Sequence, residues 1–329
     1  MKHTYDYKSC KLYGREAFLG GNTIRLCCNG HLAKEPEFFK FYFNDLGNGI
    51  NEFKERTNKL FKMHSKNLPG PCEGCPFLID QIGQTDFLEE KLLKHISFTI
   101  GFNGDVCNIA CIYCKNQHKK YTKSTNPSLL NLVKQVVESY GDTALPNLRF
   151  ASGEFFFRKD AEEILEYLLP KKCKMSVVTN ATIYSENFME MIKTYRVHFI
   201  NTSLDCGTKE THIKVKKRNL FDTVIKNLIT YSNAGLEIRL KYIFLPGIND
   251  NEDDLINFLI FAKSISAKIE ISTDIQNRKN NLPSHTMDAI FWLYQKSQEN
   301  NLSVQFRQEG FSEYDRSKIK NMNMLIAQI

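Results

Sequence analysis

Apolar runs rich in β-forming residues alternate with amphipathic segments from residue 95 to residue 307. The β-rich runs, such as "HISFTIGF", are expected to be strands; they cover 95–102, 147–152, 174–180, 197–205, 236–246, 267–273 and 302–307. The segments between them repeat apolar residues at helical spacing and cover 126–141, 160–169, 185–195, 220–235, 250–265 and 285–300. This alternation predicts βαβ units and a parallel sheet, which closes into a full or partial barrel or stays open and doubly wound.

The first 90 residues have a different pattern, rich in Gly, Pro and aromatic residues, with one amphipathic segment at 49–64. A compact unit with little apolar core needs a cross-link or a metal to be stable. We therefore expect a small cysteine-rich, metal-dependent domain at 1–90, followed by an α/β domain at 91–329.

Composition places the chain among ordinary folded proteins, because 42% of its 329 residues are hydrophobic and 25% are charged. No apolar run approaches the ~20 residues that cross a bilayer, and the N-terminus lacks the apolar block of a signal peptide. We expect a cytoplasmic protein without a membrane partner. The net charge of +7 is spread along the chain, with one basic run at 212–218, so a nucleic-acid partner is not expected.

Three cysteines follow the first predicted strand of the α/β domain in a C-x3-C-x2-C pattern: Cys107, Cys111 and Cys114. In a reducing compartment such spacing favours metal ligation over disulfides. Three thiolates can hold three irons of a [4Fe–4S] cube and leave the fourth iron open to a small chelating molecule. Zinc, with His118 as a fourth donor, and inert thiols are the alternatives. Because the loop follows the carboxyl end of a strand, it is expected on the active face.

The N-terminal cysteines supply five thiols where a closed metal site needs four. The "PCEGCPF" segment is a C-x2-C knuckle, a spacing that suits two ligands of one metal. We expect Cys10, one of Cys27 and Cys28, Cys72 and Cys75 to hold an auxiliary [4Fe–4S] cluster, with zinc as the alternative.

The cysteine loop and the strand ends together resemble the radical S-adenosylmethionine (radical SAM) superfamily over roughly residues 95–280. Tyr113, in "CIYC", stands where that family has an aromatic residue beside the adenine. The segment "SGE" (Ser152-Gly153-Glu154) resembles the Gly-Gly-Glu motif that binds the methionine amino group, with Ser in place of the first Gly. Three more strand-end matches follow in the family's order: Thr179-Asn180, Ser203-Leu204-Asp205, and "FLPGIND" at Phe244 to Asp250.

The resemblance implies a partial (β/α)6-type TIM barrel with parallel strands, a [4Fe–4S] cluster on the cysteine loop and bound S-adenosylmethionine. An electron from a flavodoxin- or ferredoxin-like reductant would cleave the sulfonium, giving methionine and a 5′-deoxyadenosyl radical that abstracts a substrate hydrogen. The residues implied to bind S-adenosylmethionine are Tyr113, Gly153, Glu154, Asn180, Ser203, Asp205, Lys216, Arg218 and Arg239.

The cation that pairs with the S-adenosylmethionine carboxylate stays open among Lys216, Lys217 and Arg218 after the fourth strand and Arg239 and Lys241 within the fifth. Strand alternation places Glu237, Arg239 and Lys241 on one face, so an internal ion pair is the alternative function of Arg239.

The substrate is expected to be a peptide or protein, or a carbohydrate. The N-terminal knuckle resembles the auxiliary-cluster (SPASM-type) modules of peptide-modifying radical enzymes, although those modules normally follow the barrel. Alternatives are a non-catalytic iron–sulfur or zinc-binding regulatory protein and an RNA-modifying, methylthiotransferase-like enzyme, whose usual RNA-binding module has no room after residue 307. Cys206, next to "SLD", is a candidate hydrogen-atom donor or a cysteine without a role, and Cys173 is expected to be a packing thiol.

Overall fold

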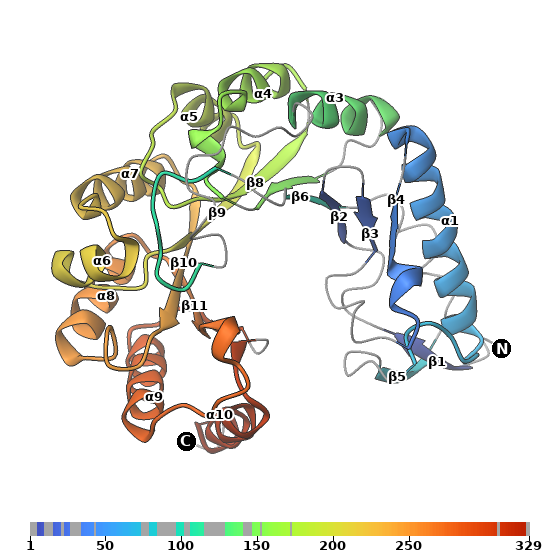
Figure 1. The fold of residues 1–329 in the computed structure, drawn as a ribbon. Helices are drawn as coiled ribbons and strands as arrows, with labels where there is room; N and C mark the ends of the chain where they lie inside the picture. The colour runs from blue at the N-terminus through green and yellow to red at the C-terminus, as the bar shows by residue number, and fades with distance from the viewer. Residues whose placement is uncertain are drawn as a thin grey trace. The chain divides into compact units, whose positions relative to one another are not determined.

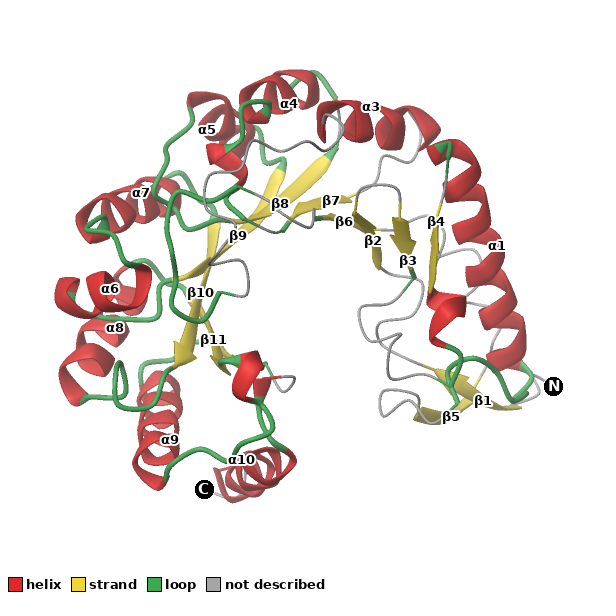
Figure 2. Cartoon of the chain, viewed as in Figure 1, coloured by secondary structure: helices red, strands yellow, loops and turns green. Residues whose placement is uncertain are grey.

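The chain forms two compact units, one from residues 1–105 and 123–176 and the other from 106–122 and 177–329. These come from a computed structural model, shown in Figures 1 and 2. It describes residues 5–9, 16–20, 23–26, 34–42, 44–73, 79–83, 97–101, 106–114, 129–140, 147–151, 153–171, 173–307 and 310–326.

The first unit contains a mixed sheet around strand β6 (Ser97–Ile100). On one side β6 pairs in parallel with β7 (Asn147–Phe150), and on the other it pairs in parallel with β2 (Glu16–Gly20). The sheet continues from β2 through the antiparallel strands β3 (Thr23–Arg25) and β4 (Lys40–Tyr42). A separate antiparallel pair joins β1 (Tyr5–Ser9) to β5 (Ile79–Gly83). The pairing of β2 with β6 means that N-terminal residues extend the sheet that carries β6 and β7.

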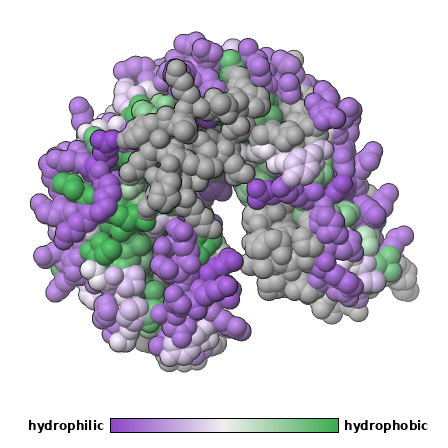
Figure 3. Space-filling view, viewed as in Figure 1, coloured by the Kyte–Doolittle hydropathy of each residue, from purple (hydrophilic) through white to green (hydrophobic). Residues whose placement is uncertain are grey.

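The helices of the first unit lie along this sheet, and in Figure 2 α3 and α4 lie on the same side of β6 and β7. They are α1 (Leu46–Ser65), α3 (Leu129–Tyr140) and α4 (Ala161–Leu168), with the 3-10 turns η2 (Pro36–Phe39) and η4 (Phe155–Phe157). Helix α1 confirms the amphipathic segment predicted at 49–64. Its buried face meets the sheet where the rings of Phe53 and Phe98 lie 6.3 Å apart, and Figure 3 shows mostly hydrophilic residues over its outer side.

The second unit contains a parallel sheet in the order β12, β11, β10, β9. Strand β9 (Val197–Ser203) pairs with β10 (Glu237–Phe244), which pairs with β11 (Lys268–Thr273), and β11 pairs with β12 (Val304–Phe306). Strand β8 (Lys174–Val178) begins in residues of the first unit and ends in residues of the second. Alternate residues of β10, namely Ile238, Leu240 and Tyr242, are fully buried, as expected for a central strand.

Helices alternate with these strands, and in Figure 1 α7 and α8 lie on the same side of β9 and β10. The helices of the second unit are α5 (Glu186–Lys193), α6 (Lys209–Lys216), α7 (Phe221–Asn233), α8 (Glu252–Ser264), α9 (Ser284–Glu299) and α10 (Glu313–Ile326), with the 3-10 turn η5 (Ile275–Asn277). The α/β fold with mostly parallel strands is therefore confirmed. The helical conformation of α6 and α10 was not anticipated, and the domain boundary at residue 90 stays a prediction.

Helix α6 lacks a strong apolar stripe, and its basic run masked the helical signal. The side-chain oxygen of Thr208 accepts a hydrogen bond from the Thr211 amide at 3.3 Å, and Lys217 ends the helix in the left-handed region. None of the helices in the described part of the chain combines the length and the apolar run needed to span a membrane.

Gly207 connects the end of β9 to α6 and touches the backbone of α8. A Cβ atom at this position would lie 2.1 Å from the Asp254 carbonyl oxygen and 2.5 Å from the Phe258 amide nitrogen. We predict that Gly207→Ala destabilises the fold by about 3 kcal/mol, because helix backbone cannot move aside as a side chain can. Gly235→Ala is the matched control, since Gly235 has φ +85° with open space around it and costs only about 1 kcal/mol. Urea unfolding measures both, and equal losses would contradict the steric account.

His212 is buried in α6, packs edge-on against the Phe221 ring, and its Nδ1 donates to the Arg218 carbonyl at 3.2 Å. Burial, reinforced by the positive charge of Lys216, lowers its pKa from 6.5 to about 4. Between these values the unfolded chain binds the proton and the folded chain does not, so stability falls as the pH drops through this window.

We therefore predict that the wild type loses about 2 kcal/mol of unfolding free energy on this account between pH 7.5 and pH 5. His212→Gln keeps a side-chain N–H and removes the titration, so its stability should change less over the same range. Urea unfolding at the two pH values measures the difference, with the exposed His285→Gln as control. A His212→Gln variant with the full wild-type pH dependence would refute the assignment.

Candidate functional site

The three predicted cluster ligands, Cys107, Cys111 and Cys114, lie half-buried on one loop of the second unit. The loop turns on itself where the Cys114 amide donates to the Cys111 carbonyl at 3.0 Å. Backbone hydrogen bonds from Ala110 to the Lys216 carbonyl (3.1 Å) and from Ile112 to the Val215 carbonyl (3.0 Å) attach it to the end of α6. The loop that carries the three thiols is thus held in place by backbone hydrogen bonds to α6.

The end of β8 holds the first cysteine through a small network of amide groups. The Asn180 amide donates to Asn108 Oδ1 at 2.8 Å and to the Cys107 sulfur at 3.8 Å. Thr182 donates to Asn180 Oδ1 and in turn accepts from the Asn108 side chain at 2.8 Å. Asn180, predicted from its position at a strand end, therefore lies against the cysteine loop. Sequence reasoning missed Asn108, whose position inside the cysteine spacing was the available signal.

A buried ion pair supports the aromatic residue between the second and third cysteines. Lys216 Nζ lies 2.5 Å from Asp205 Oδ2 and donates to the Tyr113 hydroxyl at 2.8 Å and to the Ser203 carbonyl at 2.6 Å. The Tyr113 hydroxyl donates to the same Asp205 oxygen at 2.6 Å. The Lys216 ammonium also lies 5.1 Å from the centre of the Tyr113 ring. Tyr113, Ser203, Asp205 and Lys216 were all predicted as site residues. The fold brings them into contact from three separate parts of the sequence.

The charges in this group explain its protonation. Burial raises the pKa of Tyr113 well above 10, and the negative charge of Asp205 raises it further, so the phenol stays neutral. Burial alone would lower the pKa of Lys216, but the attraction of Asp205 outweighs it and the net shift is upward, so the ammonium stays charged. Lys216 and Asp205 are 3% and 0% exposed, which makes each the necessary counterion of the other.

Asp205 is itself fixed by the backbone around it. Its φ of 62° is in the left-handed region, and its Oδ1 accepts from the Ile243 amide at 2.8 Å. Its carbonyl accepts from Asn249 Nδ2 at 2.8 Å, and Asn249 also bonds the backbone of Ile243 and Leu245. The loop after β10 therefore buries Asn249 to hold the end of β9. Sequence reasoning noted this loop as a motif without assigning that role to Asn249.

The donor set fits an iron–sulfur cluster by its chemistry, since it offers three thiols on one short, positioned loop. Burial raises the pKa of the Cys111 thiol, with Lys216 acting in the opposite direction, and binding to iron would displace that proton. Within the described residues, no three His, Cys, Asp or Glu side chains lie together in the arrangement of a single-ion site.

The predicted ligands of the methionine amino group lie in the first unit. Glu154 is fully buried, caps the 3-10 turn η4 and accepts from the Phe156 amide at 3.2 Å. Gly153 has φ 59°, a conformation that favours glycine. Ser152 lies outside the described residues. The assignment of Gly153 and Glu154 to S-adenosylmethionine stays a prediction.

Two other predicted cations differ in their surroundings. Arg239 donates to Glu237 on its own strand at 2.7 Å, and its guanidinium lies 3.5 Å from the centre of the Phe199 ring. An ion pair is therefore present in this row, with both of its side chains about 30% exposed. Arg218 is exposed and follows the end of α6. A role of either residue toward a carboxylate stays a prediction.

The remaining cysteines fall into two groups. Cys206 is fully buried and its thiol donates to the Leu204 carbonyl at 3.2 Å; burial raises its pKa well above 9. Its thiol therefore carries the hydrogen that a donor needs, and its role stays a prediction. Cys173 is fully buried, as a packing thiol requires. Cys72 is half-buried, whereas Cys10, Cys27, Cys28, Cys75 and the alternative donor His118 lie outside the described residues.

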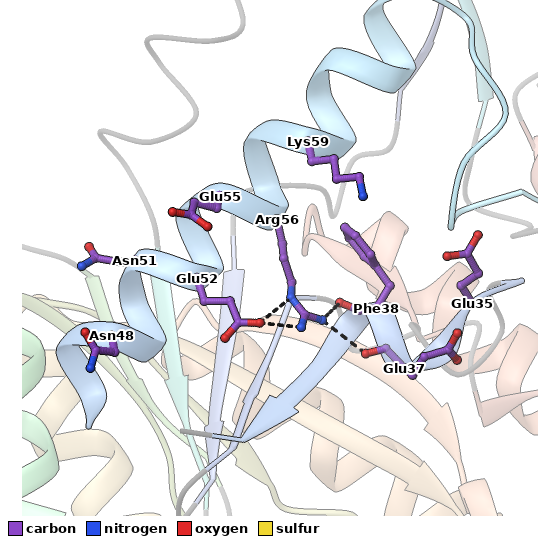
Figure 4. A pocket seen from close by; sticks show the side chains of 9 residues that line it. All are labelled: Glu35, Glu37, Phe38, Asn48, Asn51, Glu52, Glu55, Arg56 and Lys59. Carbon is purple, nitrogen blue, oxygen red and sulfur yellow. Dashed lines mark hydrogen bonds and ion pairs between the residues drawn. The ribbon is translucent and has the colours of Figure 1, made fainter. Parts of the chain in front are cut away.

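A wide depression of about 970 Å³ lies between α1 and η2 in the first unit (Figure 4). Its centre is Arg56, which donates to Glu52 on the same helix and to the carbonyls of Glu37 and Phe38. Figure 4 shows Arg56 bonded to Glu52 within α1 and to Glu37 and Phe38 of η2, with Glu55 and Asn51 directed elsewhere. The arginine at this depression is thus used to join α1 to η2.

Comparison with known proteins identifies a domain in the middle of the chain. Residues 104–259 match the family model described as "Radical SAM superfamily". A probable GTP 3′,8-cyclase of Methanosarcina mazei is 28% identical over 192 residues, covering 56% of each chain. The antilisterial bacteriocin subtilosin biosynthesis protein AlbA of Bacillus subtilis is 27% identical over 140 residues, covering 41% of this chain and 30% of AlbA. The chain thus spans about half the length, or less, of these curated relatives.

The fold of the chain is also similar to that of a solved structure. The crystal structure of Streptococcus suis SuiB bound to precursor peptide SuiA matches with a TM-score of 0.50 at 12% sequence identity, over 78% of this chain and 61% of SuiB. The family match begins just before the three cysteines and ends in α8, so it contains the cysteine loop, Glu154, Asn180, Asp205 and Lys216. Residues 104–259 therefore form a domain that matches the radical SAM superfamily.

Proposed function

We propose that this chain is an enzyme that reductively cleaves S-adenosylmethionine at a [4Fe–4S] cluster held by Cys107, Cys111 and Cys114. The observation that carries the proposal is the loop itself, in which three thiols within a radical SAM domain are fixed to α6 and to the end of β8. A cluster bound by these three thiols would supply reducing chemistry for cleavage of the sulfonium C–S bond of S-adenosylmethionine. A flavodoxin- or ferredoxin-like protein would supply the electron.

The residues around the loop would prepare the site before any ligand binds. Asn180 directs an N–H at the Cys107 sulfur, and hydrogen bonds to ligand sulfurs tune the potential of an iron–sulfur centre. Lys216 and Asp205 hold the Tyr113 hydroxyl from two sides, so the ring is oriented in advance for an adenine. Lys216 thereby acts on the cofactor through Tyr113.

Glu154 would bind the methionine ammonium, because a buried carboxylate forms strong charge-assisted hydrogen bonds with an ammonium. Gly153 would allow the backbone to approach the ligand closely. Asn180 and Ser203 are proposed as further S-adenosylmethionine-binding residues, since each lies at the carboxyl end of a strand. Four of the N-terminal cysteines, namely Cys10, one of Cys27 and Cys28, Cys72 and Cys75, would hold an auxiliary cluster.

We propose a peptide or protein as the substrate, supported by the sequence similarity to AlbA, a bacteriocin biosynthesis protein. A guanosine nucleotide is the second candidate, supported by the similarity to the GTP 3′,8-cyclases. The carbohydrate substrate considered from the sequence stays a prediction without a comparable relative among those described above. Incubation with GTP and with candidate peptides, followed by mass spectrometry of both, separates the two classes.

The cluster assignment predicts the effect of removing its ligands. The triple variant Cys107→Ala/Cys111→Ala/Cys114→Ala should lose 5′-deoxyadenosine formation by about 100-fold or more, because a cluster cannot bind without its thiolates. It should retain about four irons per chain if the N-terminal thiols hold a second cluster. Anaerobic reconstitution, iron analysis and a dithionite-driven assay measure both, with Cys173→Ala as the control. Wild-type activity in the triple variant would refute the proposal.

The Lys216–Asp205 pair predicts a separation of stability from cofactor binding. Lys216→Met should cost about 3–5 kcal/mol of stability, because it leaves Asp205 buried without a counterion. It should also weaken S-adenosylmethionine binding by about tenfold, because the Tyr113 ring loses its support. The double variant Asp205→Asn/Lys216→Met should recover most of the stability but not the affinity. Equilibrium dialysis and urea unfolding test this, and wild-type affinity in Lys216→Met would contradict it.

A further inference from the structure

A small pocket of about 280 Å³ lies at the carboxyl ends of β10 and β11, where the loop 274–283 meets the start of α10. Among the described residues that line it, polar side chains outnumber apolar ones by seven to five. The residues that line it are Phe244, Leu245, Pro246, Thr273, Asp274, Asn277, Asn280, Asn281, Leu282, Pro283, Gly310, Ser312 and Asp315. A pocket of this size admits a single side chain or a small amine more readily than a larger cofactor.

One buried oxygen in this pocket has no partner among the described residues. Asp315 is 1% exposed, and its Oδ2 accepts from the Ser312 hydroxyl at 2.7 Å and from the Leu282 amide at 3.2 Å. Its Oδ1 accepts no hydrogen bond within the described part of the chain. A buried carboxylate oxygen without a donor is unfavourable, so this atom is complementary to a ligand that brings one.

The charge of the lining determines which donor fits. Asp274 and Asp315 both line the pocket, and among the described residues its lining contains no Lys, Arg or His. Asp274 is used within its own turn, where it accepts from the Gln276 amide at 2.9 Å. An anionic group such as a phosphate or carboxylate would meet two carboxylates here and no cation, whereas an ammonium would gain charge-assisted hydrogen bonds.

The apolar part of the lining matches the rest of such a ligand. Leu245, Pro246, Leu282 and Pro283 provide surfaces along which a short chain of methylene groups can lie. An alkylammonium, the chemistry of a lysine side chain, therefore combines both properties of the pocket.

The pocket also adjoins the cysteine loop. Gln276, in the turn η5 beside the lining residue Asn277, donates from its side chain to the Tyr113 carbonyl at 2.6 Å. Leu245 lines the pocket and also belongs to the apolar cluster that packs against Ile112 and Tyr113. A ligand in the pocket would thus contact Leu245, which belongs to the apolar cluster that packs against Tyr113 of the cysteine loop.

We propose that this pocket binds a ligand through an alkylammonium group, with Asp315 as its anion. The identification of this ligand as the substrate, a lysine-bearing peptide, rests on the proposed function. The binding of an ammonium group by the pocket does not depend on the proposed function. The alternative source of the ammonium is the methionine part of S-adenosylmethionine, and the experiment below separates the two.

The test uses the full-length chain and three probes of similar size: n-butylammonium, n-butanol and butyrate. Ligand-observed NMR titration should show binding of n-butylammonium and none of butyrate. Asp315→Asn should weaken n-butylammonium binding by at least tenfold, because Asn can keep the two bonds of Oδ2 while directing an N–H, and no charge, into the pocket. Asp288→Asn, at an exposed carboxylate of α9, is the matched control and should bind as the wild type does.

A second variant tests the pocket independently, in case Asp315→Asn does not fold. Asn280 is exposed and lines the pocket, so Asn280→Lys adds a repelling charge without removing a buried contact, and it should also weaken n-butylammonium binding by at least tenfold. Equal binding of butyrate and n-butylammonium, no amine binding by the folded wild type, or unchanged binding in both variants would overturn the proposal.

Competition identifies the source of the ammonium. If S-adenosylmethionine does not displace n-butylammonium but a lysine-containing peptide does, the pocket is a substrate subsite. Displacement of n-butylammonium by S-adenosylmethionine would support an ammonium-binding pocket. It would overturn the assignment of that pocket to the substrate. Substrate-free 5′-deoxyadenosine formation by the wild type tests the proposed function separately, because it does not depend on binding at Asp315.

Discussion

The buried ion pair between Lys216 and Asp205 is the interaction on which the candidate site depends. Both side chains are removed from solvent, so each is tolerated only because the other is present. The pair joins α6 to the end of β9 and offers its remaining hydrogen-bonding capacity to Tyr113. The position of the cysteine loop thus depends on the need of two buried charges, Lys216 and Asp205, for each other as counterions.

The backbone around Asp205 shows how the fold meets this requirement. Asp205 adopts a left-handed conformation that non-glycine residues rarely take, and Asn249 and the Ile243 amide hold it there. Lys216 also offers its backbone carbonyl to the cysteine loop, so one residue supports that loop by both its main chain and its side chain. A site built from such shared contacts is positioned before a cofactor binds, which reduces the cost of ordering it later.

Much of the second unit could be predicted from the sequence, because hydrophobic periodicity determines strand and helix and because parallel strands end at a common edge. The resemblance of those strand ends to the radical SAM superfamily then led to Tyr113, Asn180, Ser203 and Asp205. Sequence analysis left five basic residues as candidates for the S-adenosylmethionine carboxylate. It did not anticipate that Lys216 pairs with Asp205, because that contact depends on the turn of α6. It also missed the pairing of β2 with β6 and the orphan oxygen of Asp315, since both depend on contacts between distant segments.

The central claim is that the cysteine loop holds a cluster with one iron open to S-adenosylmethionine. The most direct measurement is the EPR spectrum of the anaerobically reconstituted, dithionite-reduced chain, recorded with and without S-adenosylmethionine. The account predicts a [4Fe–4S]⁺ signal whose g-values shift when the ligand is added and do not shift with methionine alone. Two results would contradict it. One is a reduced cluster signal, assigned to this loop, that S-adenosylmethionine does not change. The other is purified protein in which the three loop cysteines bind only zinc.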